Sequence, residues 1–137
     1  MICASMSFAS QMKSMRTSLE ELGHVPLTTK DLDHLIANPH IIDDLDADLK
    51  HCIENDIYRS FFDLVGTSDA ILVLNYPKNG TAGYIGASTL MELAVGYYLR
   101  KQLYLLEDPP SYHDVRWAHE VAIMQPTIIH GDLKLIK

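Results

Sequence analysis

The sequence predicts an α/β domain in which helices cover both faces of a parallel sheet. Two short apolar runs, residues 70–74 and 103–106, have the composition of strands that are buried on both sides. Segments with helical periodicity precede and separate these runs, and such alternation is typical of parallel sheets. The 137 residues contain no repeat and no linker-like tract, so we expect a single domain over residues 1–137.

The amino-terminal part is expected to form a short strand from Ile2 and then an amphipathic helix. Apolar residues recur at helical spacing between residues 12 and 22. Ser7 or Ser10 is a candidate N-cap, and Gly23 stands where the helix needs a left-handed exit.

The next segment is expected to carry little regular structure before a long helix begins. Residues 24–27 fit the end or edge of a sheet, because Pro26 donates no hydrogen bond, and residues 28–42 are expected to be a surface loop. A long helix is expected from Asp43 and Asp44, whose charges suit the positive end of a helix dipole. Its buried stripe is marked by Leu45, Leu49, Cys52, Ile53, Ile57, Phe61 and Leu64.

The order of elements continues after the strand at 70–74. Apolar residues at positions 91, 94, 95, 98 and 99 indicate a second amphipathic helix, with Ser88 and Thr89 as capping candidates. The strand at 103–106 follows. A short helix around residues 117–121 and a short strand at 127–129 complete the expected order.

Composition excludes several classes of function. The chain has 18 acidic and 11 basic residues, a formal charge of −7, and no Lys/Arg-rich run, so we expect no binding to nucleic-acid polymers. Two cysteines without a C-x-x-C pair, and seven histidines without an H-E-x-x-H pattern, predict neither a disulfide scaffold nor a metal site. With no apolar membrane span and no signal peptide in the pattern, we expect a soluble cytoplasmic protein.

Glu92 is the candidate catalytic residue. It falls in the first turns of the helix that follows the buried strand and its loop. A carboxylate near a helix N-terminus, at the carboxyl end of a parallel sheet, is expected to stay ionised and to point toward the ligand crevice. It can then act as a nucleophile or stabilise a cation. Spacing alone leaves open that Glu92 only complements the helix dipole.

Three segments carry a resemblance to a known family: SDAILV at residues 68–73, GYIGASTLMELA at 83–94 and RKQLYLL at 100–106. They resemble the nucleoside 2-deoxyribosyltransferase family, whose superfamily includes the 2'-deoxynucleoside 5'-monophosphate N-hydrolases. The resemblance implies a flavodoxin-like or Rossmann-like sheet and cleavage of an N-glycosidic bond without a cofactor. It also implies that Glu92 attacks the anomeric carbon of a deoxyribose.

The chemistry that the resemblance implies has a clear physical requirement. The transition state is similar to an oxocarbenium ion, which a facing carboxylate can stabilise and then trap as a glycosyl-enzyme. Water as the acceptor gives hydrolysis, and a second nucleobase gives transfer. The base leaves more easily if a neighbouring acid protonates its ring.

The chain departs from the family at the position of that acid. Family members carry an aspartate eight positions before the residue that matches Asp69, and here this position is Phe61. Asp63 and Asp56 are weak substitutes, because they project from other parts of the helix. Either another group therefore protonates the departing base, or the bases that leave need little protonation, or the chain binds its ligand without turnover.

The remaining candidates for substrate binding lie in loops next to the expected crevice. Ser5 and Ser7 follow the first strand where family hydrolases have glycine and serine, and the missing glycine makes a close approach of phosphate less certain. Aromatic rings are candidates to stack on a base, and amide or hydroxyl groups to bind a sugar. Packing or capping roles stay open for these candidates, which are Phe8, Asn75, Tyr76, Tyr84, Ser88 and Thr89.

Three functions therefore remain open. The first is a nucleoside deoxyribosyltransferase or N-glycosidase of nucleotide metabolism, and the second is a (deoxy)nucleoside 5'-monophosphate N-hydrolase that needs an anion site at Ser5, Ser7 and Ser88. The third is a non-catalytic nucleotide-binding module on the same fold. The expected partner is a small-molecule nucleoside or nucleotide. A homo-oligomer is implied, because residues 124–132 fall where family members complete a pocket, in some cases a neighbour's.

Overall fold

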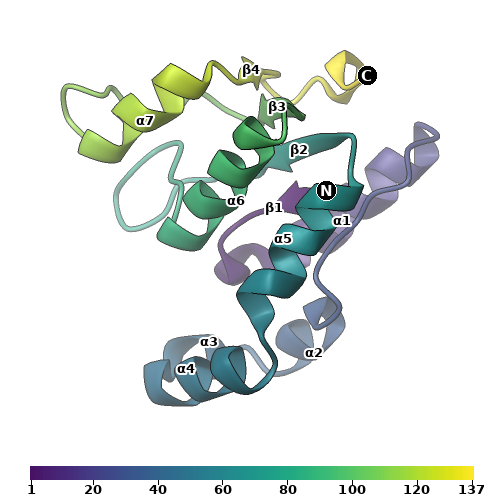
Figure 1. Cartoon of the computed structure of the whole chain (residues 1–137), viewed down its shortest axis with the longest axis vertical. Helices are drawn as coiled ribbons and strands as arrows, with labels where there is room; N and C mark the ends of the chain where they lie inside the picture. The colour runs from purple at the N-terminus through teal and green to yellow at the C-terminus, as the bar shows by residue number, and fades with distance from the viewer.

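The computed structural model describes residues 1–137 and has a four-stranded parallel sheet at its centre (Figure 1). The strands follow the order β1-β2-β3-β4. In the register, Ile2 pairs with Leu72, Leu72 with Tyr104, and Tyr104 with Thr127. The predicted α/β class is confirmed, and the strands are β1 (Ile2–Cys3), β2 (Ala70–Val73), β3 (Gln102–Leu105) and β4 (Thr127–Ile128).

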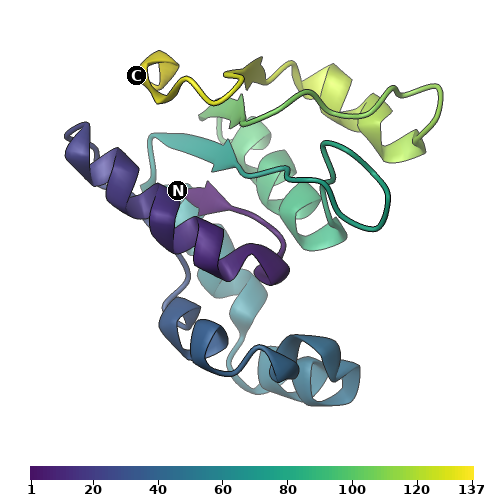
Figure 2. The same cartoon turned by 180° about the vertical axis from the view of Figure 1, so that it is seen from behind.

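Helices cover both faces of this sheet, as Figures 1 and 2 show. The helix α1 packs on one face through Met12 and Leu19, whereas α5, α6 and α7 pack on the other through Val65, Leu93 and Val121. No helix is both long enough and apolar enough to cross a membrane. The helices are η1 (Met6–Phe8), α1 (Ala9–Glu21), α2 (Leu32–Ala37), α3 (His40–Asp43), α4 (Leu45–Glu54), α5 (Ile57–Thr67), α6 (Ala87–Tyr98), α7 (Arg116–Met124) and η2 (Leu133–Leu135).

Residues 24–27 lie beside β1 without forming a regular strand. The N–H of Ile2 donates a hydrogen bond of 2.9 Å to the carbonyl oxygen of Leu27. This bond places the segment on the free side of β1, and Pro26 next to it has no N–H to extend the ladder. With this segment counted as an edge, the spatial order is that of a flavodoxin-like sheet.

The expectations for residues 28–67 were wrong in two respects. The expected loop contains α2 and α3, and the expected long helix is divided into α4 and α5. The division falls at Asp56, whose φ of 48° is left-handed and ends the run of helical geometry. Asp44 does begin α4, since its carboxylate accepts the N–H of Ala47 at 3.0 Å.

The apolar stripe of α4 is exposed and not buried. Leu45, Leu49 and Ile53 keep 77%, 58% and 71% of their surface exposed. The reason is that α3 and α4 project from the body of the domain, away from the sheet, in both views (Figures 1 and 2). These side chains therefore have no layer to pack on.

Neither α1 nor α6 begins at a predicted serine or threonine cap. A 3₁₀ turn leads into α1 and puts Phe8 at its N-cap, while Gly86 holds the N-cap of α6. Ser88 and Thr89 consequently lie in the first turn of α6. The predicted left-handed exit from α1 is confirmed, because Gly23 has a φ of 88°.

Gly96 lets α6 rest directly on the sheet. A Cβ atom at this position would lie 2.9 Å from Cγ1 of Ile71 on β2 and 3.1 Å from Cδ2 of Leu103 on β3. Only a residue without a side chain permits this close approach. The distance between α6 and the sheet is thus set in the buried core.

Candidate functional site

A cavity of about 270 Å³ lies beyond the carboxyl ends of β1 and β2. One wall is formed by residues 4–6, which follow β1, and another by residue 84 and residues 86–89 at the start of α6. The helices α1 and α6 pack on opposite faces of the sheet. The cavity therefore lies where the connection from β1 to α1 and the connection from β2 to α6 diverge. Ligands of open α/β sheets bind at such a switch point.

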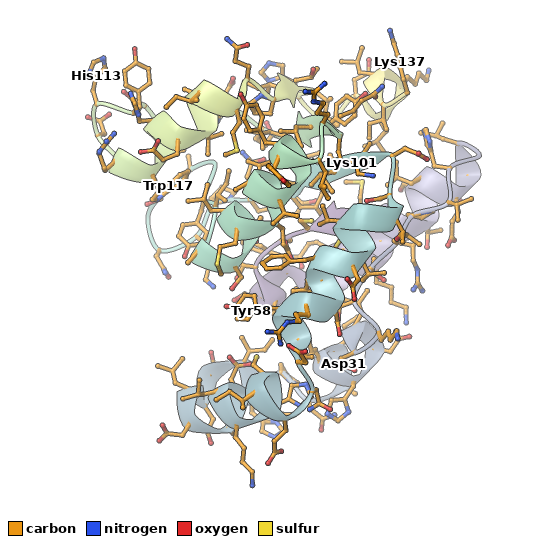
Figure 3. The ribbon with its side chains drawn as sticks, in the orientation of Figure 1. Asp31, Tyr58, Lys101, His113, Trp117 and Lys137 are labelled. Carbon is orange, nitrogen blue, oxygen red and sulfur yellow. The ribbon has the colours of Figure 1, made fainter.

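A second depression, wider and shallower, lies at the other end of the sheet. Its volume is about 900 Å³, and its lining includes Arg100, Lys101 and Gln102 at the start of β3. Figure 3 shows Lys101 and Lys137, which both line it, far from Asp31 and Tyr58, which line the first cavity. Because it lies at the amino ends of the strands, it is away from Glu92.

Glu92 forms part of the cavity wall and keeps only 5% of its surface exposed. No Lys, Arg or His side chain forms an ion pair with it. Burial raises the pKa of Glu92 from 4.5 to about 7, and a hydrogen bond from the thiol of Cys3 opposes part of that rise. Glu92 is therefore only partly ionised at neutral pH, and not fully ionised as the sequence predicts, because it lies in the second turn of α6 and is desolvated.

Four of the other predicted residues line the same cavity. Ser5 comes from the loop after β1, Tyr84 from the loop before α6, and Ser88 and Thr89 from the first turn of α6. The hydroxyls of Ser88 and Tyr58 form a hydrogen bond of 3.0 Å across the gap between α6 and α5. The structure thus brings these four side chains together with Glu92.

The other four predicted residues do not line the cavity. Phe8 and Tyr76 pack against each other edge to face, with ring centroids 5.3 Å apart. Asn75 is fully buried, and both ends of its side-chain amide are bonded to the backbone of Glu107. Ser7 accepts a hydrogen bond from Lys78 next to the cavity.

Lys78 was not singled out from the sequence, yet it lies beside the cavity. Its Nζ donates to the Oγ atoms of Ser5, at 2.8 Å, and Ser7, at 2.7 Å, and lies 5.7 Å from the ring centroid of Tyr84. No carboxylate lies within ion-pair distance of this ammonium. The sequence did contain one signal for this loop. The Asn79-Gly80 pair after Lys78 predicts a turn, at which the chain reverses direction.

The segment from residue 29 to 58 supplies the remaining wall, which the sequence analysis missed. His51 on α4 places Nε2 at 3.2 Å from Oδ2 of Asp31, and Asn55 places Nδ2 at 3.1 Å from Nδ1 of His51. One sequence signal for this wall was available. Helical spacing places Asp48, His51 and Cys52 on the same face of a helix. The lining residues of this segment are Thr29, Asp31, Leu35, Ile42, Asp48, His51, Cys52, Ile57 and Tyr58.

Phe61, at the position where the resemblance places an acid, lines the cavity with its ring. Neither aspartate nearby replaces it. Asp63 lines a separate depression, and Asp56 forms an exposed ion pair of 3.0 Å with Arg59. Residues 124–132, which the resemblance assigns to a pocket, do not reach the cavity of their own chain.

Within the structure, no three His, Cys, Asp or Glu side chains are grouped closely enough to hold a metal ion. No protein-family model, no curated protein and no solved structure matches this chain, which leaves the residues around Glu92 as the basis for a functional assignment.

Proposed function

We propose that this protein cleaves or transfers the N-glycosidic bond of a (deoxy)nucleoside or nucleotide, with Glu92 as the nucleophile. The observation that supports this proposal is a desolvated carboxyl group without a cationic partner in the wall of a cavity at the switch point of the sheet. A structural carboxylate at such depth would be expected to carry an ion pair.

The proposed reaction uses the ionised form of Glu92. The ionised carboxylate forms a bond to the anomeric carbon while the bond to the base nitrogen breaks and its electron pair leaves with the base. Desolvation strengthens the attraction between this carboxylate and the developing oxocarbenium ion. Water or a second base then attacks the same carbon and releases the carboxylate of Glu92.

The cavity has the dimensions and lining for one small ligand. Its volume of about 270 Å³ is just below the usual range of small-molecule sites. Tyr84 and Phe61 offer aromatic rings for a base, and the hydroxyls of Ser88 and Thr89 lie one turn before Glu92 on the same helix. A sugar between base and carboxylate would thus meet hydroxyl groups.

A 5'-monophosphate N-hydrolase is the second candidate, and Lys78 is the observation that favours it. The ammonium is held by Ser5 and Ser7 without a carboxylate partner. Because these hydroxyls accept from the ammonium, the hydrogen of Ser7 is free to donate to an anion. A phosphate attached to the sugar would find a cation and a hydroxyl donor at the edge of the cavity.

One experiment tests these proposals together. The protein is incubated with deoxynucleosides, ribonucleosides and their 5'-monophosphates, with and without a free acceptor base, and the released or exchanged base is followed by chromatography. We expect base release that is lost in Glu92→Gln. If every substrate is left intact while calorimetry detects nucleotide binding, the catalytic proposal is wrong and the protein is a binding module. A Glu92→Gln variant with full turnover would remove the nucleophile assignment.

A further inference from the structure

We propose that Asp31 and His51, here called the acid pair, protonate the departing base. This inference rests on the proposed function, because it assigns the second catalytic role of the same cavity. Asp31 comes from the turn before α2 and His51 from α4, and both line the cavity that contains Glu92. Figure 3 shows Asp31 below the end of α5 at which Tyr58 lies.

The reaction needs an acid that the expected position cannot supply. A purine or pyrimidine leaves far more slowly as an anion than as a protonated, neutral base. Phe61 occupies a place in the cavity wall where a carboxyl group would serve, and its ring carries no transferable proton. Any proton for the base must therefore come from another group that faces the cavity.

The other titratable groups in the cavity wall are already engaged or poorly suited. The hydroxyl of Tyr58 shares a hydrogen bond with Ser88, and the thiol of Cys52 points to Oδ1 of Asp48 at 3.8 Å. Burial and the charge of Asp48 raise the pKa of the Cys52 thiol, which makes it a weaker acid. Tyr84 has a phenol hydroxyl, which is a far weaker acid than a carboxyl group.

The acid pair has the geometry of a fixed proton carrier. The imidazole of His51 is held at both nitrogens, by Asp31 on one side and by Asn55 on the other, so the ring cannot turn freely. Because the amide of Asn55 donates to Nδ1, the ring hydrogen lies on Nε2 and is donated to Asp31. Oδ2 of Asp31 faces His51, while its second oxygen has no hydrogen-bond partner in the protein. That second oxygen is the atom free to meet a ligand.

The acid pair lies among acidic and neutral side chains of the cavity wall. Asp48 and Cys52 lie on α4 beside His51, Asp31 faces it from the turn before α2, and Tyr58 lines the same wall from α5. Glu92 lines the same cavity from α6. No Lys or Arg side chain lines this cavity, so no fixed cation competes with a ligand for the carboxyl group of Asp31.

The proton balance of the proposed step is complete. The step begins with Asp31 as a carboxylic acid, protonated on the oxygen that does not face His51, while its Oδ2 accepts the Nε2–H of neutral His51. As the glycosidic bond breaks, the electron pair goes to the base nitrogen, the proton passes from Asp31 to the base, and the Glu92 carboxylate bonds to the sugar carbon. The pair is left as a carboxylate that accepts a hydrogen bond from neutral His51. Attack of water on the glycosyl ester returns a proton to it and frees Glu92.

A comparison of leaving groups tests this role. A purine nucleoside or nucleotide that the protein cleaves is compared with its N7-methyl derivative, whose cationic base departs without protonation. For pyrimidine substrates, thymine is compared with 5-fluorouracil. We expect His51→Gln and Asp31→Asn to lower kcat/KM for the ordinary base by about 100-fold. The same variants should lower it less than about threefold for the activated base.

His34→Gln is the matched control. His34 on α2 has the same local arrangement, with the amide of Asn38 bonded to its carbonyl oxygen, but it is exposed and does not line the cavity. We expect it to match the wild type on both substrates. Equal losses on ordinary and activated bases, or wild-type rates in both variants, would overturn the acid role. Wild-type protein that releases no base from either substrate would instead overturn the proposed function itself.

Discussion

The side-chain amide of Asn75 is bonded to both backbone groups of Glu107. Its Nδ2 donates to the carbonyl oxygen at 2.7 Å, and its Oδ1 accepts from the N–H at 2.9 Å. Asn75 follows β2 and Glu107 follows β3, so this contact joins the carboxyl ends of two neighbouring strands. The edge of the sheet that carries the cavity is therefore held together by a side chain that does not line it.

Asn75→Ala should lower the free energy of unfolding by about 3 kcal/mol, because it leaves two backbone groups of Glu107 without their partner. Urea denaturation measures the loss. Gln11→Ala, which removes an exposed amide from α1, should change stability by less than about 0.5 kcal/mol. Wild-type stability combined with weaker ligand binding would show that Asn75 serves the ligand and not the fold.

Glu92→Gln should stabilise the protein at alkaline pH and not at acidic pH. The folded protein holds a proton on Glu92 up to about pH 7, whereas the unfolded chain releases it near 4.5. The free energy of unfolding therefore falls as the pH rises through this window, and above it the full cost of the buried carboxylate remains. Glutamine avoids that cost, which is about 3 kcal/mol at pH 8.

Urea denaturation at pH 4.5 and pH 8 measures this difference. Glu21→Gln, at an exposed position at the end of α1, provides the control and should behave as the wild type at both pH values. An equal effect of Glu92→Gln at the two pH values would contradict the raised pKa of Glu92.

The rate of glycosidic cleavage should depend on the ionisation of Glu92. If the carboxylate is the nucleophile, as we propose, kcat/KM should fall by about tenfold per pH unit below the pKa of about 7. Cys3→Ala should move this acidic limb of the pH profile to higher pH, because the hydrogen bond from the thiol lowers the pKa of Glu92. Cys3→Ser keeps a donor and should leave the limb close to its original position. A limb that stays in place in Cys3→Ala would argue against a role of the thiol.

Lys78→Gln should distinguish nucleotides from nucleosides. If the ammonium binds a phosphate, this variant raises KM for a 5'-monophosphate by about 10- to 100-fold and leaves KM for the nucleoside unchanged. Lys101→Gln is a suitable control, because Lys101 also donates to a neutral acceptor, the carbonyl oxygen of Gly66, at the other end of the sheet. Equal effects of Lys78→Gln on both substrates would assign Lys78 to loop structure alone.

The sheet and the helices packed on it could be predicted because their patterns are local. The apolar runs that became β2 and β3 and the periodicity that became α6 describe segments buried by their neighbours. The prediction that the apolar stripe from Leu45 to Leu64 is buried was wrong for α4. Periodicity identifies the apolar face of a helix, but it does not say whether another element packs on that face. The break at Asp56 was not foreseen, because the apolar spacing continues across it from Ile53 to Ile57.

The candidate site was only partly predictable for a related reason. Glu92, Ser5 and Tyr84 could be placed because the carboxyl ends of parallel strands meet at one edge. The wall with Asp31 and His51 depends on how α2 and α4 return toward that edge, which is a property of tertiary packing. Lys78 likewise reaches Ser5 across 73 positions of sequence, a contact that no local pattern encodes.

Gly96 has a consequence that extends beyond packing. It stands one helical turn after Glu92 and faces the sheet, where its missing side chain allows α6 to touch Ile71 and Leu103. A bulkier residue there would lift the helix and carry the carboxyl group of Glu92 with it. Gly96, which does not line the cavity, thus sets how far the carboxyl group of Glu92 extends into it, and mutagenesis confined to the cavity lining would overlook this residue.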